Sequence, residues 1–203
     1  MKTMVSATKV GQQIVLPGAS LWLVDQWCAD SESVNIMNRL QSELDWNQPE
    51  ITLFGRSNPI PRLQAWYGDA GTRYRYSGMT MQPEPWQPTL LALKQQLEQT
   101  LSYQFNSVLA NLYRDGRDSM GWHSDNEPEL GSAPVIASLS FGAPRRFQMR
   151  HKYQGYKFEL VLGAGSLLVM SGVTQQHWQH AVPKQSKVHE PRINLTFRTV
   201  RGV

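Results

Sequence analysis

The chain of 203 residues is 40% hydrophobic, which is enough to bury one substantial core, so we expect a single domain. Its single cysteine, Cys28, excludes a disulfide scaffold, and no apolar run reaches the length of a membrane span. We therefore expect an intracellular protein with no membrane partner, cytoplasmic in a bacterium or nuclear in a eukaryote, whose formal net charge of +4 favours an anionic partner.

Two helices are predicted in the first half of the chain. Residues 31–44 have Ser31 as a candidate N-cap and apolar residues at helical spacing, namely Val34, Met37, Leu40 and Leu44. Residues 89–105 have Thr89 as a candidate N-cap and a stripe formed by Leu90, Leu93, Leu97 and Leu101. Both stripes are expected to face the core. The segment 45–88 between them is rich in Pro, Gly and aromatic residues, which predicts hairpins and loops.

After residue 105 the sequence changes to short β segments separated by turn residues. Six strands are expected, at residues 107–113, 135–141, 146–151, 156–162, 166–171 and 192–200. Strands at this density, without helices between them, predict an α+β, mainly β fold with a jelly-roll or barrel core behind an N-terminal α/β extension.

A candidate for metal binding is the H-x-D pair of His123 and Asp125. Residues at positions i and i+2 of an extended segment project to the same side, so an imidazole and a carboxylate can reach one ion. So short a motif also arises by chance, and the pair alone does not decide between a metal site and a solvated turn.

The C-terminal strand carries two arginines on one face. Alternation places Ile193, Leu195 and Phe197 on one side and Arg192, Asn194, Thr196 and Arg198 on the other. If the apolar side packs against the rest of the protein, the arginines line an interior, where a small dicarboxylate would satisfy both. A surface strand with two solvated arginines is the alternative that the pattern leaves open.

A third metal ligand is expected from residues 176–183, which contain His177 and His180. Two histidines and one carboxylate, with open positions left over, are typical of non-haem iron(II) oxygenases. A structural zinc site usually needs several cysteines and this chain has one, whereas a catalytic zinc hydrolase stays open as an alternative.

Several separated runs closely resemble the AlkB family of iron(II)- and 2-oxoglutarate-dependent nucleic-acid demethylases. They are residues 53–79, 111–130, 134–152, 165–183 and 191–198, in the order found in that family. The resemblance covers about residues 50–200 and is strongest to the branch that repairs duplex DNA. It implies a double-stranded β-helix (jelly-roll) core at about 106–203, preceded at about 1–105 by an extension with a nucleotide-recognition lid, in one domain.

The resemblance also implies residue roles. His123, Asp125 and His180 match the iron ligands, which makes His177 a neighbour of the site. The positions that hold 2-oxoglutarate in the family are Asn111, Tyr113, Arg192, Thr196 and Arg198. The implied enzyme couples oxidative decarboxylation of 2-oxoglutarate by O2 to removal of an N-methyl group, which leaves as formaldehyde.

The implied substrate is alkylated DNA, with lesions of the 1-methyladenine and 3-methylcytosine type. Such a base must be flipped out of a duplex to reach the iron. Tyr76 matches the aromatic residue that stacks on the base, with the ring of His123 on its other side and Tyr74 and Arg75 nearby. Ordinary strand packing is the alternative interpretation of these tyrosines.

The turn around Phe54, Gly55 and Arg56 has the composition of a wedge that fills the hole left by a flipped base, next to a phosphate contact. A buried loop anchor is the alternative interpretation of Phe54. The chain departs from the duplex-repairing relatives at Asn126, where they carry an acid expected to face the exocyclic amine of the base. Replacing this acid by an amide is expected to weaken the preference for a cationic methylated base or to shift the substrate range.

Three functions are therefore compared. The first is repair of alkylated DNA, preferably double-stranded and by a monomeric enzyme. The second is the same reaction on RNA or on single-stranded nucleic acid, and the third is a non-catalytic nucleic-acid-binding module. The complete sets of metal and co-substrate residues argue against the third, and the Phe54 turn favours the first.

Overall fold

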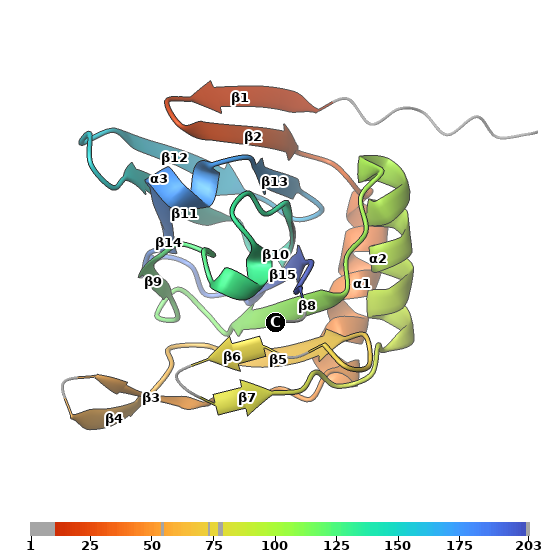
Figure 1. Cartoon of the computed structure of the whole chain (residues 1–203). Helices are drawn as coiled ribbons and strands as arrows, with labels where there is room; N and C mark the ends of the chain where they lie inside the picture. Colours follow the sequence, from red (N-terminus) through yellow and green to blue (C-terminus); the bar gives the residue numbers. More distant parts are fainter. Residues whose placement is uncertain (1–10, 54, 73, 77–78, 202–203) are drawn as a thin grey trace, which may run out of the picture.

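The computed structural model describes residues 11–53, 55–72, 74–76 and 79–201, and its main part consists of two antiparallel sheets (Figure 1). The larger sheet has seven strands in the spatial order β1 (Gln12–Leu16), β2 (Ala19–Val24), β13 (Leu167–Ser171), β10 (Ile136–Gly142), β15 (Arg192–Arg198), β8 (Ser107–Tyr113) and β5 (Leu63–Gly68). The smaller sheet has the order β12 (Lys157–Leu162), β11 (Arg145–His151), β14 (Trp178–Val182) and β9 (Met120–His123). These paired antiparallel sheets confirm the predicted mainly β, jelly-roll fold.

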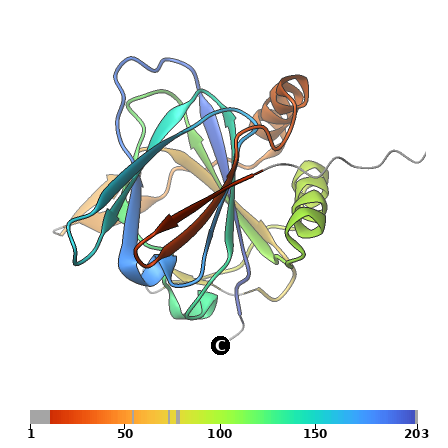
Figure 2. The same cartoon turned by 90° about the horizontal axis from the view of Figure 1, so that it is seen from above.

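The helices α1 (Asp30–Glu43) and α2 (Pro88–Leu101) cover one side of the larger sheet, and β11 and β12 of the smaller sheet lie on the opposite side of the molecule (Figure 2). One buried apolar cluster joins the helices to the larger sheet and includes Leu40, Leu93, Leu139 and Phe197. A second cluster lies between the sheets and includes Tyr113, Phe147 and Met170. The described helices are too short and too polar to cross a membrane.

The strand β15 has the two faces that alternation predicted. Ile193, Leu195 and Phe197 are fully buried in the cluster under the helices. Because successive side chains point to opposite sides of a strand, Arg192 and Thr196 face the space between the sheets. The alternative of a solvated surface strand is therefore wrong.

The helix ends differ from the predicted ones. Ser31 does not cap α1, because the N-cap is Ala29, and the acidic side chains of Asp30 and Glu32 in the first turn favour the helix dipole instead. Thr89 does not cap α2, which begins with Pro88 at its first position, and its hydroxyl donates to Glu43 of α1 at 2.7 Å. Tertiary contacts thus outweigh the local capping preference.

The predicted core-facing stripe of α1 is confirmed for Met37, Leu40 and Leu44, which are buried. Val34 is 59% exposed, so its assignment to the stripe is wrong, and Ser33 and Ile36 complete the buried face. In α2 the buried residues Leu90, Leu93 and Leu97 agree with the prediction.

Two small hairpins lie beside β5 at one edge of the larger sheet (Figure 1). They are β3 (Glu50–Leu53) with β4 (Arg56–Pro59), and β6 (Tyr74–Tyr76) with β7 (Met79–Met81). The chain on the outer flank of each hairpin pairs with β5, through Asn47 with Gln64 and through Glu84 with Tyr67. The segment predicted as hairpins and loops therefore borders the strand that forms one wall of the site.

Candidate functional site

His123, Asp125 and His180 form the one group of three or more potential metal ligands found among the described residues. One ligand atom from each of the three lies within 4.8 Å of the others. His123 ends β9 and lies opposite His180 in the neighbouring β14, and Asp125 follows in the loop after β9. The structure thus brings two imidazoles and one carboxylate together between the sheets. His177 stacks on His151 instead, with 5.7 Å between the ring centres.

Hydrogen bonds outside the cluster fix the orientation of its members. The Nδ1 atom of His123 lies 2.9 Å from the carbonyl oxygen of Gly121, which can only accept, so Nδ1 carries the proton and Nε2 keeps its lone pair for a metal. The backbone N–H of Asp125 donates to Oε1 of Gln175 at 3.0 Å, and the hydroxyl of Ser124 donates to the carbonyl of Trp178 at 2.8 Å. The chain is therefore held in place at Ser124 and at the backbone of Asp125.

The protonation states of the cluster suit a metal cation. Burial by itself would raise the pKa of the Asp125 carboxyl. The charge of Arg198, the two neighbouring histidines and the hydrogen bond from Nη2 of Arg198 to Oδ1 at 2.8 Å together outweigh this and hold that pKa below its ordinary value. Burial and the neighbouring His123 lower the pKa of His180 to about 3. A charged carboxylate and a neutral imidazole are the forms that bind metals.

The face next to the cluster is formed by β8 and β15. The pocket that holds the cluster is also lined by four of the predicted co-substrate residues, Asn111, Tyr113, Thr196 and Arg198. The fifth, Arg192, is 2% exposed, and its Cζ atom lies 5.3 Å from the ring centre of Tyr113. All five residues therefore gather around one space between the sheets.

Arg192 is a buried cation without an anion. Its Nη2 donates to the hydroxyl of Ser140 at 2.9 Å, but among the described residues its Nε and Nη1 atoms have no hydrogen-bond partner. Burial lowers the pKa of the guanidinium to about 10, so it stays charged at neutral pH. A buried guanidinium with two unused donors fits a carboxylate ligand.

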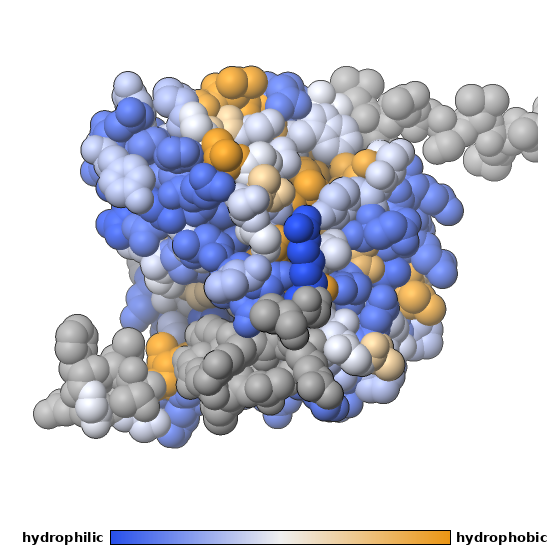
Figure 3. Space-filling view, viewed as in Figure 1, coloured by the Kyte–Doolittle hydropathy of each residue, from blue (hydrophilic) through white to orange (hydrophobic). Residues whose placement is uncertain are grey.

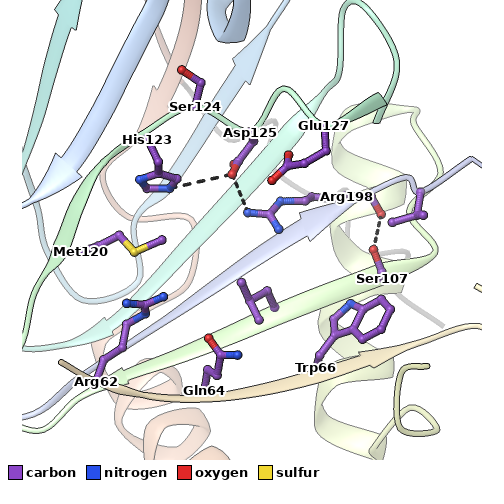
Figure 4. Close-up of a pocket in the computed structure, with 12 residues that line it drawn as sticks. Arg62, Gln64, Trp66, Ser107, Met120, His123, Ser124, Asp125, Glu127 and Arg198 are labelled. Carbon is purple, nitrogen blue, oxygen red and sulfur yellow. Dashed lines mark hydrogen bonds and ion pairs between the residues drawn. The ribbon is translucent and has the colours of Figure 1, made fainter. Parts of the chain in front are cut away.

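Beside the cluster lies a pocket of about 150 Å³ that opens between β5 and β9 (Figure 4). Gln64 and Trp66 project into it from β5, Arg62 from the residue directly before β5, and Met120 and His123 from β9. Glu127 and Arg198 complete the wall on the side of Asp125 (Figure 4). Within the described part of the chain, the buried Oε2 atom of Glu127 has no hydrogen-bond partner. The pocket thus places an unused carboxylate oxygen near the metal cluster.

A family model described as the 2OG-Fe(II) oxygenase superfamily matches residues 20–198. The chain belongs to this family. The mouse "Alpha-ketoglutarate-dependent dioxygenase alkB homolog 3" is 43% identical over 210 residues, which cover 96% of this chain and 68% of the mouse protein. The human "DNA oxidative demethylase ALKBH2" is 40% identical over 181 residues, which cover 84% of this chain and 69% of the human protein.

Among solved structures, "The structure of OsALKBH1" superposes with a TM-score of 0.63 at 18% identity, covering 92% of this chain and 100% of that chain. This likeness supports the jelly-roll fold alone. The sequence relatives place the chain in the AlkB family of dioxygenases that use Fe(II), 2-oxoglutarate and O2.

The site fits the cofactors of an AlkB-family dioxygenase. His123, Asp125 and His180 offer the two imidazoles and one carboxylate that suit iron(II), and no cysteine lies among them to favour a structural zinc site. The unused donors of Arg192 fit the distal carboxylate of 2-oxoglutarate. Asn111 is already engaged, because its Oδ1 accepts from Nε of Arg62 at 2.8 Å, which leaves its amide nitrogen as the group free to donate.

The predicted substrate residues of this AlkB-family enzyme are described only in part. Gly55 is an exposed turn residue with a φ of 76°, a backbone conformation that favours glycine, between β3 and β4. Phe54 lies outside the described residues, and so do the side chains of Arg56, Tyr74, Arg75 and Tyr76, whose backbones belong to β4 and β6.

Asn126 is exposed and lines neither of these two pockets, whereas the next residue, Glu127, lines the one beside the cluster. Sequence reasoning therefore missed Glu127, and it also missed Arg62 and Gln175. Glu127 follows directly on the H-x-D motif, which is the local signal that points to it. Arg62 and Gln175 reach the site from 49 and 50 residues away along the chain, and no local pattern marks them.

Proposed function

We propose that this AlkB-family dioxygenase repairs DNA by oxidative demethylation of N-alkylated bases of the 1-methyladenine and 3-methylcytosine type. The observation that carries the proposal is the pocket beside the metal cluster, where Oε2 of Glu127 is buried without a partner. Bases methylated at these ring nitrogens carry a positive charge and an exocyclic amine, and both favour a carboxylate. The human relative that is named a DNA oxidative demethylase supports the same substrate class.

Bound iron(II), with 2-oxoglutarate and O2, supplies the chemistry: the methyl carbon is hydroxylated, 2-oxoglutarate becomes succinate and CO2, and the hydroxymethyl group leaves as formaldehyde. The chain itself orients the reactants. His123, Asp125 and His180 hold the iron, and Arg192 with Tyr113 and Asn111 holds the distal carboxylate of 2-oxoglutarate.

In this proposal Arg198 has two roles, one at the metal cluster and one at the co-substrate. Its hydrogen bond to Asp125 fixes one oxygen of the iron ligand, and its position in both pockets brings its charge next to the co-substrate. Thr196 donates to Asn194, whose amide in turn donates to Ser138 and to the carbonyl of Leu139, so this part of the face is held by β10.

The substrate base is bound in the pocket between β5 and β9. Trp66 offers a flat apolar surface on which a base can stack, and the partly exposed ring of His123 lies on the metal side. A base inside a duplex cannot enter such a pocket, so we propose that it is flipped out. The turn at Phe54, Gly55 and Arg56 then fills the gap, and Tyr76, with Tyr74 and Arg75, contacts the extruded nucleotide.

The position of the two hairpins supports this role, because they flank β5, which forms one wall of the pocket. Most of the face in Figure 3 is hydrophilic, with apolar residues in small separate patches, as suits a nucleic-acid partner. We propose further that residues up to about 105 form the recognition part and residues from about 106 the catalytic part of one monomeric domain.

The same reaction on RNA or on single-stranded nucleic acid is the second candidate, since an open pocket accepts an unpaired base without flipping. The test of both is turnover on oligonucleotides with one 1-methyladenine or 3-methylcytosine, as double- and single-stranded DNA and as RNA, with iron(II), ascorbate and 2-oxoglutarate. We expect formaldehyde and the demethylated base, fastest from duplex DNA. No product from any substrate would refute the demethylase function, and fastest turnover on RNA would favour the second candidate.

A further inference from the structure

Arg145, the first residue of β11, is a buried arginine whose hydrogen bonds go to neutral acceptors. It is 1% exposed. Its Nη2 donates to the carbonyls of Asp118 and Pro183, both at 2.8 Å, its Nη1 to the carbonyl of Asp115 at 3.1 Å, and its Nε to Oε1 of Gln185 at 3.2 Å. No carboxylate within the described part of the chain forms an ion pair with it. The charges of Asp118 and Asp115 attract the guanidinium without forming an ion pair with it, and burial still lowers its pKa. A buried charge whose hydrogen bonds all go to neutral groups is costly.

The acceptors of Arg145 belong to two loops. Loop 114–119 joins β8 to β9, and loop 183–191 joins β14 to β15. The strands β9 and β14 carry the two histidines of the metal cluster, and β8 and β15 carry the co-substrate residues. Because Nη2 binds one carbonyl of each loop, a single guanidinium fixes both connections between the metal cluster and the co-substrate face.

The same guanidinium also packs on a proposed co-substrate residue. The Cζ atom of Arg145 lies 5.4 Å from the ring centre of Tyr113, and the Cζ atom of Arg192 lies 5.3 Å from the same centre. A cation at this distance is attracted to the face of an aromatic ring. Two guanidiniums therefore hold one ring that is 2% exposed.

The two cations also repel each other, since the charge of Arg145 adds to burial in lowering the pKa of Arg192. The two positive charges together create a positive electrostatic potential at the ring of Tyr113. A dianionic ligand placed there would be attracted by both charges.

We infer that Arg145 is a positioning residue of the 2-oxoglutarate site, which orders Tyr113 and both connecting loops and adds positive potential for the distal carboxylate. It does not line the pocket of the metal cluster, so it acts through Tyr113 and Arg192 rather than by contact. The inference rests on the proposed co-substrate roles of these two residues and is independent of which nucleic acid is the substrate.

The test compares Arg145→Met with Arg146→Met, its neighbour on β11. The Arg146 side chain is 43% exposed and lies 3.9 Å from Glu159, away from the site. Dissociation constants are measured without nucleic acid, by tryptophan fluorescence, with Mn(II) in place of iron(II) to prevent turnover. The ligands are 2-oxoglutarate and 2-oxopentanoate, which has the same chain length but no distal carboxylate. Melting temperatures of the unliganded variants report on the fold.

For Arg145→Met we expect the dissociation constant of 2-oxoglutarate to rise about tenfold or more, and that of 2-oxopentanoate to rise less. The reason is that only 2-oxoglutarate has a distal carboxylate, which the charge of Arg145 attracts. Arg146→Met should change neither by more than about twofold, as expected for an exposed charge. Equal weakening of both ligands by Arg145→Met would reduce Arg145 to a structural role and overturn the inference.

Arg145→Lys keeps the positive charge, but a lysine cannot reach the four acceptors of Arg145. If Arg145→Met does not fold, the 2-oxoglutarate affinity of Arg145→Lys tests the inference instead. We expect an intermediate loss of 2-oxoglutarate affinity, and an unchanged dissociation constant in this folded variant would overturn the inference. Arg192→Met serves as the reference for the co-substrate site. If Arg192→Met leaves the affinity for 2-oxoglutarate unchanged, Arg192 does not bind the co-substrate, and the inference about Arg145 is refuted as well. If the protein binds 2-oxoglutarate as expected but demethylates no nucleic acid, only the proposed demethylase function is refuted.

Discussion

Glu127 provides the sharpest test of the proposed base pocket. Its Oε2 atom is buried, lines the pocket beside the metal cluster, and has no hydrogen-bond partner among the described residues. In Glu127→Gln the shape is kept and the charge is lost, so a charge-assisted hydrogen bond to the exocyclic amine becomes a neutral one. Such bonds differ by about 1 to 1.5 kcal/mol, which corresponds to a loss of roughly five- to tenfold in kcat/KM on a cationic lesion.

The assay is demethylation of oligonucleotides that carry 1-methyladenine, which is cationic, or 3-methylthymine, which is neutral and has no exocyclic amine. We expect the loss on 1-methyladenine only, so that the preference for the cationic base falls. Asn126→Ala is the matched control, because Asn126 is adjacent and exposed, and its kcat/KM should stay within about twofold. Equal losses on both bases in Glu127→Gln, or the larger change in Asn126→Ala, would refute the assignment of Glu127.

Four further variants test other parts of the site. Asp125→Ala should abolish turnover and iron binding, because a cation loses its only carboxylate in the cluster; an iron-loaded, active variant would contradict the ligand assignment. Arg192→Met should raise the dissociation constant of 2-oxoglutarate roughly 10- to 100-fold, as measured by titration without nucleic acid. Gln175→Leu removes the acceptor for the backbone N–H of Asp125, and we expect metal affinity, measured by competition with a chelator, to fall about tenfold or more. Phe54→Ala should slow repair of duplex DNA more than repair of single strands, and equal slowing on both would count against the wedge.

The sequence predicted those elements whose partners are apolar and uniform. The strand β8 has the predicted bounds, and β15 has the predicted faces because Ile193, Leu195 and Phe197 have a helical layer to pack against. Period-two alternation is a reliable signal when one face of a strand is buried by apolar residues. Alternation placed the two arginines on the other face of the strand, but it left open whether that face is buried.

β9 and β14, two of the strands that the sequence did not predict, are held by pairing with other strands rather than by a pattern of their own. β9 has four residues of mixed exposure, and β14 has five, and neither alternates clearly. β14 pairs with β11 on one side and with β9 on the other, and β9 pairs with β14, with His123 opposite His180. Pairing between segments that are distant in the sequence produces no local sequence pattern in either segment. The metal cluster depends on such a pair of strands.

The predicted N-cap residues of the two helices were wrong for a related reason. Thr89 has the side chain of an N-cap, yet its hydroxyl is used by Glu43 of the other helix, and the chain before it places Pro88 at the first helical position. A hydroxyl can donate to whichever acceptor the tertiary fold brings near. Local preference therefore located both helices to within a few residues but did not identify the residues that cap them.

The charges of the site suggest that its two halves are organised differently before any ligand binds. Asp125 already has a partner in Arg198, so the metal cluster is held in a charged, oriented form by the protein itself. Arg192 and Arg145 lie against the same ring, and neither forms an ion pair within the described part of the chain. Since uncompensated buried charge is costly, the co-substrate half is the part whose free energy improves most when a dicarboxylate arrives. The protein thus pre-orders the metal ligands and leaves charge compensation of the arginine pair to 2-oxoglutarate.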